Sequence, residues 1–267
     1  MHSQTVVQLY EQVIARGDPV RLNQLVAPGY QPRLPAFKGH EPLPAGIESL
    51  RDRLTTLGRI PHRLVRVVAD GDLVFAHVKY EEPVPVAAVD VFRCGADGRI
   101  AEHWNVRQPL PHDGARGDDR FATTLAPDPA LRRSPAELRN LLRELLLEFW
   151  GKGQAQLVGK YYDETYIQHN TEMPGGYQRI KEIAENDIRR YIELTKGPYP
   201  IDIHHLAAEG DLVCVHLSIF MAGINRDDGR RSTNVDIFRV NAQGRMVEHW
   251  DVLHIDGVPM PSTATLF

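Results

Sequence analysis

An internal repeat constrains this chain more than any other feature of its sequence. Residues 69–77 (ADGDLVFAH) return 139 positions later, at 208–216 (AEGDLVCVH), with six of the nine positions identical. A unit of about 140 residues is too long for a solenoid repeat and indicates a duplicated domain. Two later blocks also return, each 146 positions on: VDVFR at 89–93 as VDIFR at 235–239, and GRIAEHWNV at 98–106 as GRMVEHWDV at 244–252.

Length and composition fit two domains of ordinary size. The chain has 267 residues, of which 42% are hydrophobic and 25% charged, so each half can bury a core of its own. Pro, Gly, Asp and Arg dominate 111–133, as is typical of a linker. We therefore expect a first domain at 1–110, a linker at 111–133 and a second domain at 134–267. The change of offset from 139 to 146 places seven extra residues of the second copy near 223–232, at a hairpin tip.

Charge and targeting signals point to a cytoplasmic protein. The net charge of −4 argues against a broad basic surface for nucleic acid. No apolar run reaches the roughly 18 residues of a membrane span, and the first residues do not resemble a secretory signal. Cys94 and Cys214 lie at non-equivalent positions in strand-like runs, which favours two buried thiols over a disulfide. We expect neither nucleic acid nor membrane as a partner.

Helical patterns come first in each copy, and strand patterns follow. In the second copy, Ser134 and Glu137 have the spacing of a capping box. One apolar stripe follows, made of Leu138, Leu141, Leu142, Leu145, Leu146 and Phe149. A further helical pattern covers 177–195, and short strands separated by turns fill 201–253. Helices followed by a strand meander predict an α+β domain in which helices cover one face of the sheet.

The ordered blocks of the second copy resemble a known family. YIQHN at 166–170, followed by GDLV, VDIFR and GRMVEHWDV, is similar to the SnoaL-like polyketide cyclase branch of the nuclear transport factor 2-like superfamily. The second copy matches over nearly its whole length and the first only in its strand half. The resemblance implies two tandem cone-shaped α+β barrels, each a curved antiparallel sheet wrapped round N-terminal helices with a pocket inside.

The same resemblance bears on chemistry. Polyketide cyclases of this type catalyse an intramolecular aldol condensation without a cofactor, using an acidic residue as base. Other members of the superfamily isomerise ketosteroids, dehydrate, open epoxides or only bind a ligand, so the fold does not set the reaction. We expect no cofactor and a small, largely apolar substrate that contains a carbonyl group.

Asp251 is the first candidate for a catalytic residue. Side chains alternate along a strand, so His249 and Asp251 share one face, and Glu248 and Trp250 share the other. A carboxylate in an apolar cavity has a raised pKa, which suits a base that removes a proton beside a carbonyl. The resemblance also places the acidic base of SnoaL-like cyclases on a late strand, at this position. The alternative is that Asp251 bridges groups within the sheet.

His169 is the second catalytic candidate, and Asn170 and Tyr166 are candidates for substrate binding. A histidine and an amide could donate hydrogen bonds to an enolate oxygen as negative charge develops on it. The block that contains them resembles a pocket motif of the family. The alternative is a loop whose polar side chains hold backbone groups.

Three further candidates for substrate binding are present in both copies. His216, Asp236 and His249 return in the first copy as His77, Asp90 and His103, and a structural Asp–His pair within the sheet explains such repetition equally well. No pair of histidines or cysteines has the spacing of a zinc site, so we expect no metal.

The first copy lacks the groups on which the chemistry depends. Asn105 takes the place of Asp251, and Pro32, Arg33 and Leu34 replace Gln168 to Asn170. His254 also departs from the glutamine common in relatives. We therefore interpret the chain as an internal pseudo-dimer with a degenerate first copy, and further self-association stays open. Three functions remain: a cofactor-independent enzyme with Asp251 as general base, a binding module without turnover, or a pseudo-dimeric scaffold.

Overall fold

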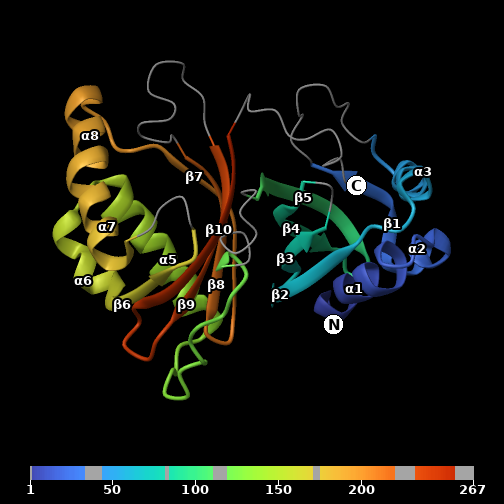
Figure 1. The fold of residues 1–267 in the computed structure, drawn as a ribbon, viewed down its shortest axis with the longest axis horizontal. Coiled ribbons are helices and arrows are strands. Elements are labelled where there is room, and N and C mark those ends of the chain that lie inside the picture. Colours follow the sequence, from blue (N-terminus) through green and yellow to red (C-terminus); the bar gives the residue numbers. More distant parts are fainter. Residues whose placement is uncertain are drawn as a thin grey trace. The chain divides into compact units, whose positions relative to one another are not determined.

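The computed structural model describes residues 2–33, 44–81, 84–110, 119–170, 175–219 and 232–255. They form two compact units: unit 1 holds the described residues up to 110, and unit 2 holds those from 119 to 255. Each unit is an α+β domain with one five-stranded sheet (Figure 1). The predicted tandem α+β architecture is confirmed.

Unit 1 begins with helices and continues into its sheet. Its helices are α1 (His2–Gln8), the π-helical η1 (Leu9–Ile14), the short η2 (Pro19–Arg21) and α2 (Leu22–Leu25), and later α3 (Ile47–Leu57). Its strands are β1 (Val26–Pro32), β2 (His62–Asp70), β3 (Leu73–Tyr80), β4 (Val86–Cys94) and β5 (Ile100–Pro109), paired in the order β1-β5-β4-β3-β2.

Unit 2 repeats this plan. Its helices are α5 (Pro135–Glu144), the π-helical η3 (Leu145–Gly151), η4 (Ala155–Leu157), α6 (Val158–Tyr161), α7 (Gly176–Glu182), the π-helical η5 (Ile183–Ile188) and α8 (Arg189–Thr195). Its strands are β6 (Tyr162–Gln168), β7 (Ile201–Glu209), β8 (Leu212–Ile219), β9 (Ser232–Val240) and β10 (Met246–Ile255), paired in the order β6-β10-β9-β8-β7.

One strand of each sheet departs from the expected antiparallel pattern. The last four strands of each copy form an antiparallel meander, but β1 pairs parallel with β5, and β6 pairs parallel with β10. A parallel partner cannot follow through a tight hairpin, and here the helix and the whole meander lie between the two strands. The sheets are therefore mixed, and they are open rather than closed into barrels.

The helical half of unit 2 follows the sequence patterns closely. The capping box is present, with Glu137 N–H donating to Ser134 Oγ and the Glu137 carboxylate accepting from the Ser134 backbone. The leucine stripe is buried against the sheet, and Leu138, Leu142 and Leu145 are each 0% exposed. Both predicted long helices change to π-helical winding part-way, at η3 and η5, so each inserts extra residues into one turn.

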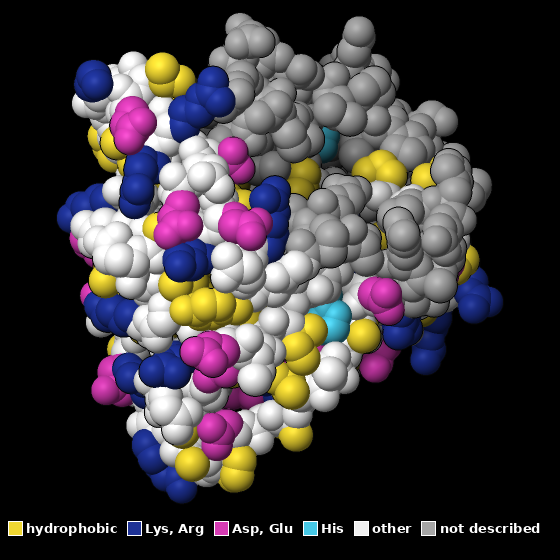
Figure 2. All heavy atoms as spheres, turned by 60° about the vertical axis from the view of Figure 1, so that its left-hand side comes forward, with side chains coloured by type: hydrophobic (Ala, Val, Ile, Leu, Met, Phe, Trp, Pro, Cys, Tyr) yellow, Lys and Arg dark blue, Asp and Glu magenta, His cyan; other side chains and the backbone are white. Residues whose placement is uncertain are grey.

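Turns and surface features add smaller details. Gly98 and Gly244 adopt positive φ angles, 79° and 78°, in the turns that precede β5 and β10. The inserted hairpin tip lies almost wholly outside the described residues, and Cys94 and Cys214 are buried thiols. Among the described helices none has the length and apolar character needed to cross a bilayer. On the face of unit 2 seen in Figure 2, acidic and basic side chains are interspersed.

Candidate functional site

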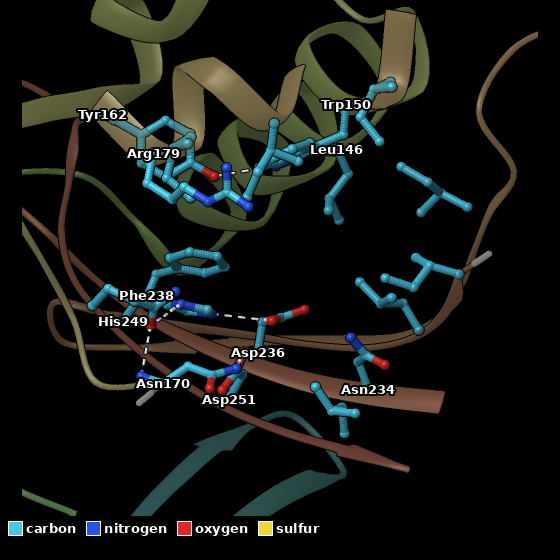
Figure 3. Close-up of a pocket in the computed structure, with 18 of the residues that line it drawn as sticks. Leu146, Trp150, Tyr162, Asn170, Arg179, Asn234, Asp236, Phe238, His249 and Asp251 are labelled. Carbon is cyan, nitrogen blue, oxygen red and sulfur yellow. Dashed lines mark hydrogen bonds and ion pairs between the residues drawn. The ribbon is translucent and has the colours of Figure 1, made fainter. Parts of the chain in front are cut away.

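A cavity of about 300 Å³ lies in unit 2 between the helices and the inner face of the sheet. In Figure 3 the helix side of the cavity carries Leu146 and Trp150, and the sheet side carries Asp236, His249 and Asp251. Both π-helical segments contribute to the wall: η3 through Leu146 and Trp150, and η5 through Ile183, Asp187 and Ile188. The remaining lining residues are Tyr162, Tyr166, Gln168, Asn170, Arg179, Ile180, Tyr199, Ile201, Leu217, Ile219, Asn234, Phe238 and Leu253.

The register of β9 and β10 gathers the polar groups. Asp251 lies directly opposite Asp236, and His249 lies directly opposite Phe238. Residues opposite each other in an antiparallel pair share a face, so all four point to the cavity. Strand β6 adds Gln168 beside His249 from the other side of β10.

His249 is held by hydrogen bonds at both ring nitrogens. Gln168 Oε1 accepts the backbone N–H of Asn170 at 3.0 Å, which fixes that oxygen as an acceptor, and it lies 2.9 Å from His249 Nδ1. The proton of this second contact therefore resides on Nδ1. His249 Nε2 lies 3.0 Å from Asp236 Oδ1, and the two atoms share one proton in a hydrogen bond. His249 is thus committed to orienting Asp236.

Asp251 has a different environment at each carboxylate oxygen. Its Oδ2 accepts a hydrogen bond from Asn170 Nδ2 at 2.8 Å. Its Oδ1 faces Arg120 Nη1 at 3.8 Å and accepts no hydrogen bond from the protein. Burial raises the pKa of Asp251 above its ordinary value; Asp236 adds to the rise, and His249, Asn170 and Arg120 only partly offset it.

Four polar groups at this cavity have no hydrogen-bond partner among the described residues. They are the Tyr166 hydroxyl, Gln168 Nε2, Asn234 Oδ1 and Asp251 Oδ1, and each atom is buried. Burial of an unsatisfied polar group costs roughly 1–3 kcal/mol, so such groups are rare in a finished core. Their convergence on one cavity is what a site that binds a polar part of a ligand requires.

Asp236, His249 and Asp251 are also the described residues best placed to hold a metal ion, because their ligand atoms lie within 4.8 Å of one another. The Arg120 guanidinium beside Asp251 would repel a cation entering this group. The Asp236–His249 hydrogen bond would also have to break. The arrangement is better suited to acid–base chemistry than to metal binding.

His169 does not line this cavity, so its predicted catalytic role is not supported by its position. It follows the end of β6, and its Nε2 lies 2.8 Å from Glu248 Oε1, on the opposite face of β10. Its ring stacks on Trp250 with the centroids 5.3 Å apart. Glu248 is 0% exposed and also accepts from Arg239 Nε at 3.1 Å, so His169 belongs to a structural ion-pair network.

His216 also points away from the cavity, so its predicted contact with substrate is not supported by its position. On β8, Val215 lies opposite Asp236, which places His216 on the other face. Its Nδ1 lies 3.0 Å from that of His205, and the two rings stack. Burial, with the charges of His205 and His204, lowers the pKa of His216 to about 3.

The other predicted site residues do line the cavity. They are Tyr166, Asn170, Asp236, His249 and Asp251. Their roles remain predictions, but their convergence from β6, β9 and β10 gives these roles a common location.

The sequence matches a family model for the SnoaL-like domain twice, at residues 6–103 and at 142–249. The chain belongs to the SnoaL-like family. The match to the first SnoaL-like copy includes its helical half, which the resemblance of the motifs alone did not reach. No curated protein sequence matches the chain.

Three similar solved structures each cover less than half of this chain. They include TsrD from Streptomyces laurentii (20% identity, 40% of this chain and 88% of that one, TM-score 0.33). Another is a steroid delta-isomerase from Pseudomonas aeruginosa (22%, 43% and 84%, TM-score 0.34). A third, from Burkholderia xenovorans, is described as a protein of unknown function (14%, 47% and 96%, TM-score 0.36). With TM-scores this low, they add nothing to the family assignment.

In the first SnoaL-like copy, the equivalent carboxylate is surrounded by hydrogen-bond donors of the copy itself. Asp90, which corresponds to Asp236, accepts hydrogen bonds from Tyr10 and Tyr80 at 2.5 and 2.9 Å and from Asn105 at 2.5 Å, and it lies 2.7 Å from His103 Nε2. Burial would raise the pKa of Asp90, but His103 and the other donors outweigh it, and the pKa is lowered. In the repeat register, Leu146, Ile219 and Leu253 of the second copy correspond to the larger Tyr10, Tyr80 and Arg107 of the first.

Sequence reasoning missed three polar contributors to the second copy's site. Arg120 lies in the predicted linker, where an arginine among Pro, Gly and Asp gives no signal. Gln168 was part of a recognised block but was not singled out. Asn234 lies two residues before Asp236 on the same strand, so the two-residue period could have found it.

Proposed function

We propose that the second SnoaL-like copy is a cofactor-independent enzyme that removes a proton beside the carbonyl group of a small substrate, with Asp251 as general base. The observation that carries this proposal is the state of Asp251. It is 7% exposed, its pKa is raised by burial, and its Oδ1 accepts no hydrogen bond from the described residues. A carboxylate in this condition binds a proton at a pH closer to neutrality than an exposed one does.

Tyr166 and Gln168 are the best candidates to stabilise the enolate oxygen. Burial raises the pKa of Tyr166 well above its ordinary value, so its hydroxyl keeps its proton and can donate it in a hydrogen bond. Gln168 Nε2 is a second unpartnered donor at the same cavity. This role falls to them because His169 lies on the other face of β10 and Asn170 Nδ2 already donates to Asp251.

The walls support a substrate with a largely apolar body. Leucine, isoleucine and aromatic side chains form most of the lining, and polar groups concentrate at the sheet side (Figure 3). A cavity of about 300 Å³ is at the small end of ligand sites. This combination favours one small molecule that has a carbonyl at one end and hydrocarbon at the other.

Loss of α-proton exchange in an Asp251→Asn variant tests the proposal without knowledge of the natural substrate. A panel of small cyclic and aromatic ketones is incubated with the protein in D₂O, and α-deuteration is followed by NMR. We expect the wild type to accelerate exchange of at least one member and Asp251→Asn to lose on the order of 100-fold or more of that rate. The control is Glu193→Gln, which removes an exposed carboxylate on α8 and should keep the full rate.

Exchange that is unchanged in Asp251→Asn would remove the assignment of the base. A different outcome would favour the alternative function, a binding module: a ketone that binds the cavity tightly and never exchanges, in wild type and variant alike. The four unpartnered groups would serve a bound ligand in either case. A purely structural scaffold function is the least favoured for the second copy, because its cavity is not filled by side chains.

A further inference from the structure

A residue from the segment between the two copies reaches the proposed base. Arg120 is 2% exposed and belongs to unit 2, but it precedes the residues matched to the second SnoaL-like domain, which begin at 142. Its Nη2 donates to Asn170 Oδ1 at 3.1 Å, and its Nη1 lies 3.8 Å from Asp251 Oδ1. The family model thus does not account for this part of the site.

We propose that Arg120 is a positioning residue that keeps Asp251 ionised and correctly aimed, partly through its own charge and partly through Asn170. The inference rests on the proposed role of Asp251 as base. It assigns to the connecting segment a function in the site, in addition to joining two domains.

The direct contribution is electrostatic. A guanidinium is always charged, and at 3.8 Å it favours the carboxylate form of Asp251. The other charged or titratable groups that act on Asp251 are Asp236 from β9, His249 from β10 and Tyr166 from β6. Burial and Asp236 act against ionisation, whereas His249, the hydrogen bond from Asn170 and the charge of Arg120 favour it.

The indirect contribution is the orientation of an amide. Asn170 can present either its oxygen or its NH₂ group to Asp251, and the two orientations have opposite effects. Because Arg120 has only donors, it requires Asn170 Oδ1 on its own side. Asn170 Nδ2 is then turned to Asp251 Oδ2, where it donates at 2.8 Å and stabilises the carboxylate.

The sequence differences between the two copies are consistent with this role of Arg120. At the position of Asp251 the first copy has Asn105, a neutral side chain that needs no cation to keep it ionised, and at the position of Asn170 it has Leu34. Base, amide and guanidinium thus form one connected set in the second copy, and the first copy has neither the base nor the amide.

Titration of the Asp251 carboxyl group tests the inference in the absence of any substrate. In ¹³C-labelled full-length protein, the carboxyl signal that disappears in Asp251→Asn is followed with pH by NMR. We expect Arg120→Gln to shift the pKa of Asp251 upward. Arg120→Lys keeps the positive charge but not the paired donors of the guanidinium, and it should shift this pKa less. Arg132→Gln is the matched control, because it removes an exposed arginine of the same segment, and it should leave the titration unchanged.

An unchanged Asp251 titration in Arg120→Gln would overturn the inference. If that variant does not fold, Asn170→Ala replaces it: an upward shift supports the connected set and an unshifted titration overturns it. The α-proton exchange assay then separates the two proposals. A shifted titration with full exchange activity in Asp251→Asn refutes the base but not Arg120, whereas an unshifted titration with loss of exchange in Asp251→Asn refutes Arg120 but not the base.

Discussion

At the scale of single residues, two carboxylates face each other across one antiparallel pair. Asp236 and Asp251 occupy directly opposite positions on β9 and β10, and the charge of the first raises the pKa of the second. The two differ in what holds them: an imidazole for Asp236, an amide and a guanidinium for Asp251. Under the proposed function, Asp251 exchanges the proton, while Asp236 is held by His249.

The raised pKa of Asp251 has a consequence for stability that depends on pH. The folded chain binds this proton more tightly than the unfolded chain does, so the associated stability is present at low pH and is lost as the pH rises through the folded-state pKa. We expect Asp251→Asn to be more stable than the wild type above that pKa. The difference in free energy of unfolding should grow as the pH rises from the ordinary carboxyl range and then level off. Urea denaturation at a series of pH values measures it.

Asp163 provides the opposite case as a control. Hydrogen bonds from the Thr165 backbone and side chain lower its pKa, so its contribution is present at higher pH and is lost on acidification. Asp163→Asn should therefore lose stability relative to the wild type as the pH rises, the reverse of Asp251→Asn. Parallel trends in the two variants would contradict a raised pKa at Asp251.

At the scale of elements, β1 and β6 are equivalent strands of the two copies. Each carries a tyrosine at the same position, and the two hydroxyl groups differ in their hydrogen bonding. Tyr30 on β1 hydrogen bonds through its hydroxyl to His103 Nδ1 at 2.9 Å, whereas the corresponding Tyr166 hydroxyl on β6 is unpartnered at the cavity. In unit 2, the equivalent histidine nitrogen, His249 Nδ1, is hydrogen bonded to Gln168 instead. The change frees one hydroxyl for a ligand.

Removing each hydroxyl should therefore have opposite effects. We expect Tyr166→Phe to leave the melting temperature unchanged or slightly higher and to slow α-proton exchange, because its hydroxyl bonds nothing in the protein. Tyr30→Phe should cost about 1 kcal/mol of stability and leave exchange intact. Calorimetry and the exchange assay on the two variants check this, and a stability loss confined to Tyr166→Phe would be the contrary result.

The elements also show what the sequence could and could not predict. The strands β7 to β10 were predicted because alternation and the repeat both mark them. The strands β1 and β6 were missed because each buries only two of its seven residues and pairs with a strand distant in the chain. Alternation on β10 placed Asp251 and His249 on one face, as found. It could not place His169, which lies beyond the end of β6, nor Arg120, whose neighbours in sequence show no periodicity.

At the scale of the molecule, the segment between the copies is held against the rest of unit 2 by part-buried polar contacts. Glu248 accepts the backbone N–H groups of Thr124 and Leu125 at 2.6 and 3.4 Å, and Trp250 Nε1 donates to the carbonyl of Ala122 at 2.6 Å. These contacts lie on the face of β10 opposite the cavity. They place the residues that follow Arg120 and therefore help to hold Arg120 itself.

Loss of the Glu248 carboxylate should thus be costly. We expect Glu248→Ala to lower the free energy of unfolding by about 3 kcal/mol, because it removes the buried carboxylate that bonds Arg239 and His169 and that accepts two part-buried backbone N–H groups. Glu102→Ala is the internal control: Glu102 pairs with Arg93 in the same way, but its side chain is 25% exposed, and its loss should cost less. Urea denaturation, monitored by tryptophan fluorescence, compares the two variants. Equal losses of unfolding free energy would contradict the view that Glu248 holds the connecting segment in place.

The tyrosines that surround Asp90 also bear on how the molecule responds to concentration. Because these tyrosines already bond the Asp90 carboxylate, we propose a ligand site only in the second of the two homologous domains, among the described residues. A chain with one ligand site shows no cooperativity, so its ligand binding follows a hyperbolic saturation curve. A sigmoidal binding curve would have to arise from interactions between separate chains.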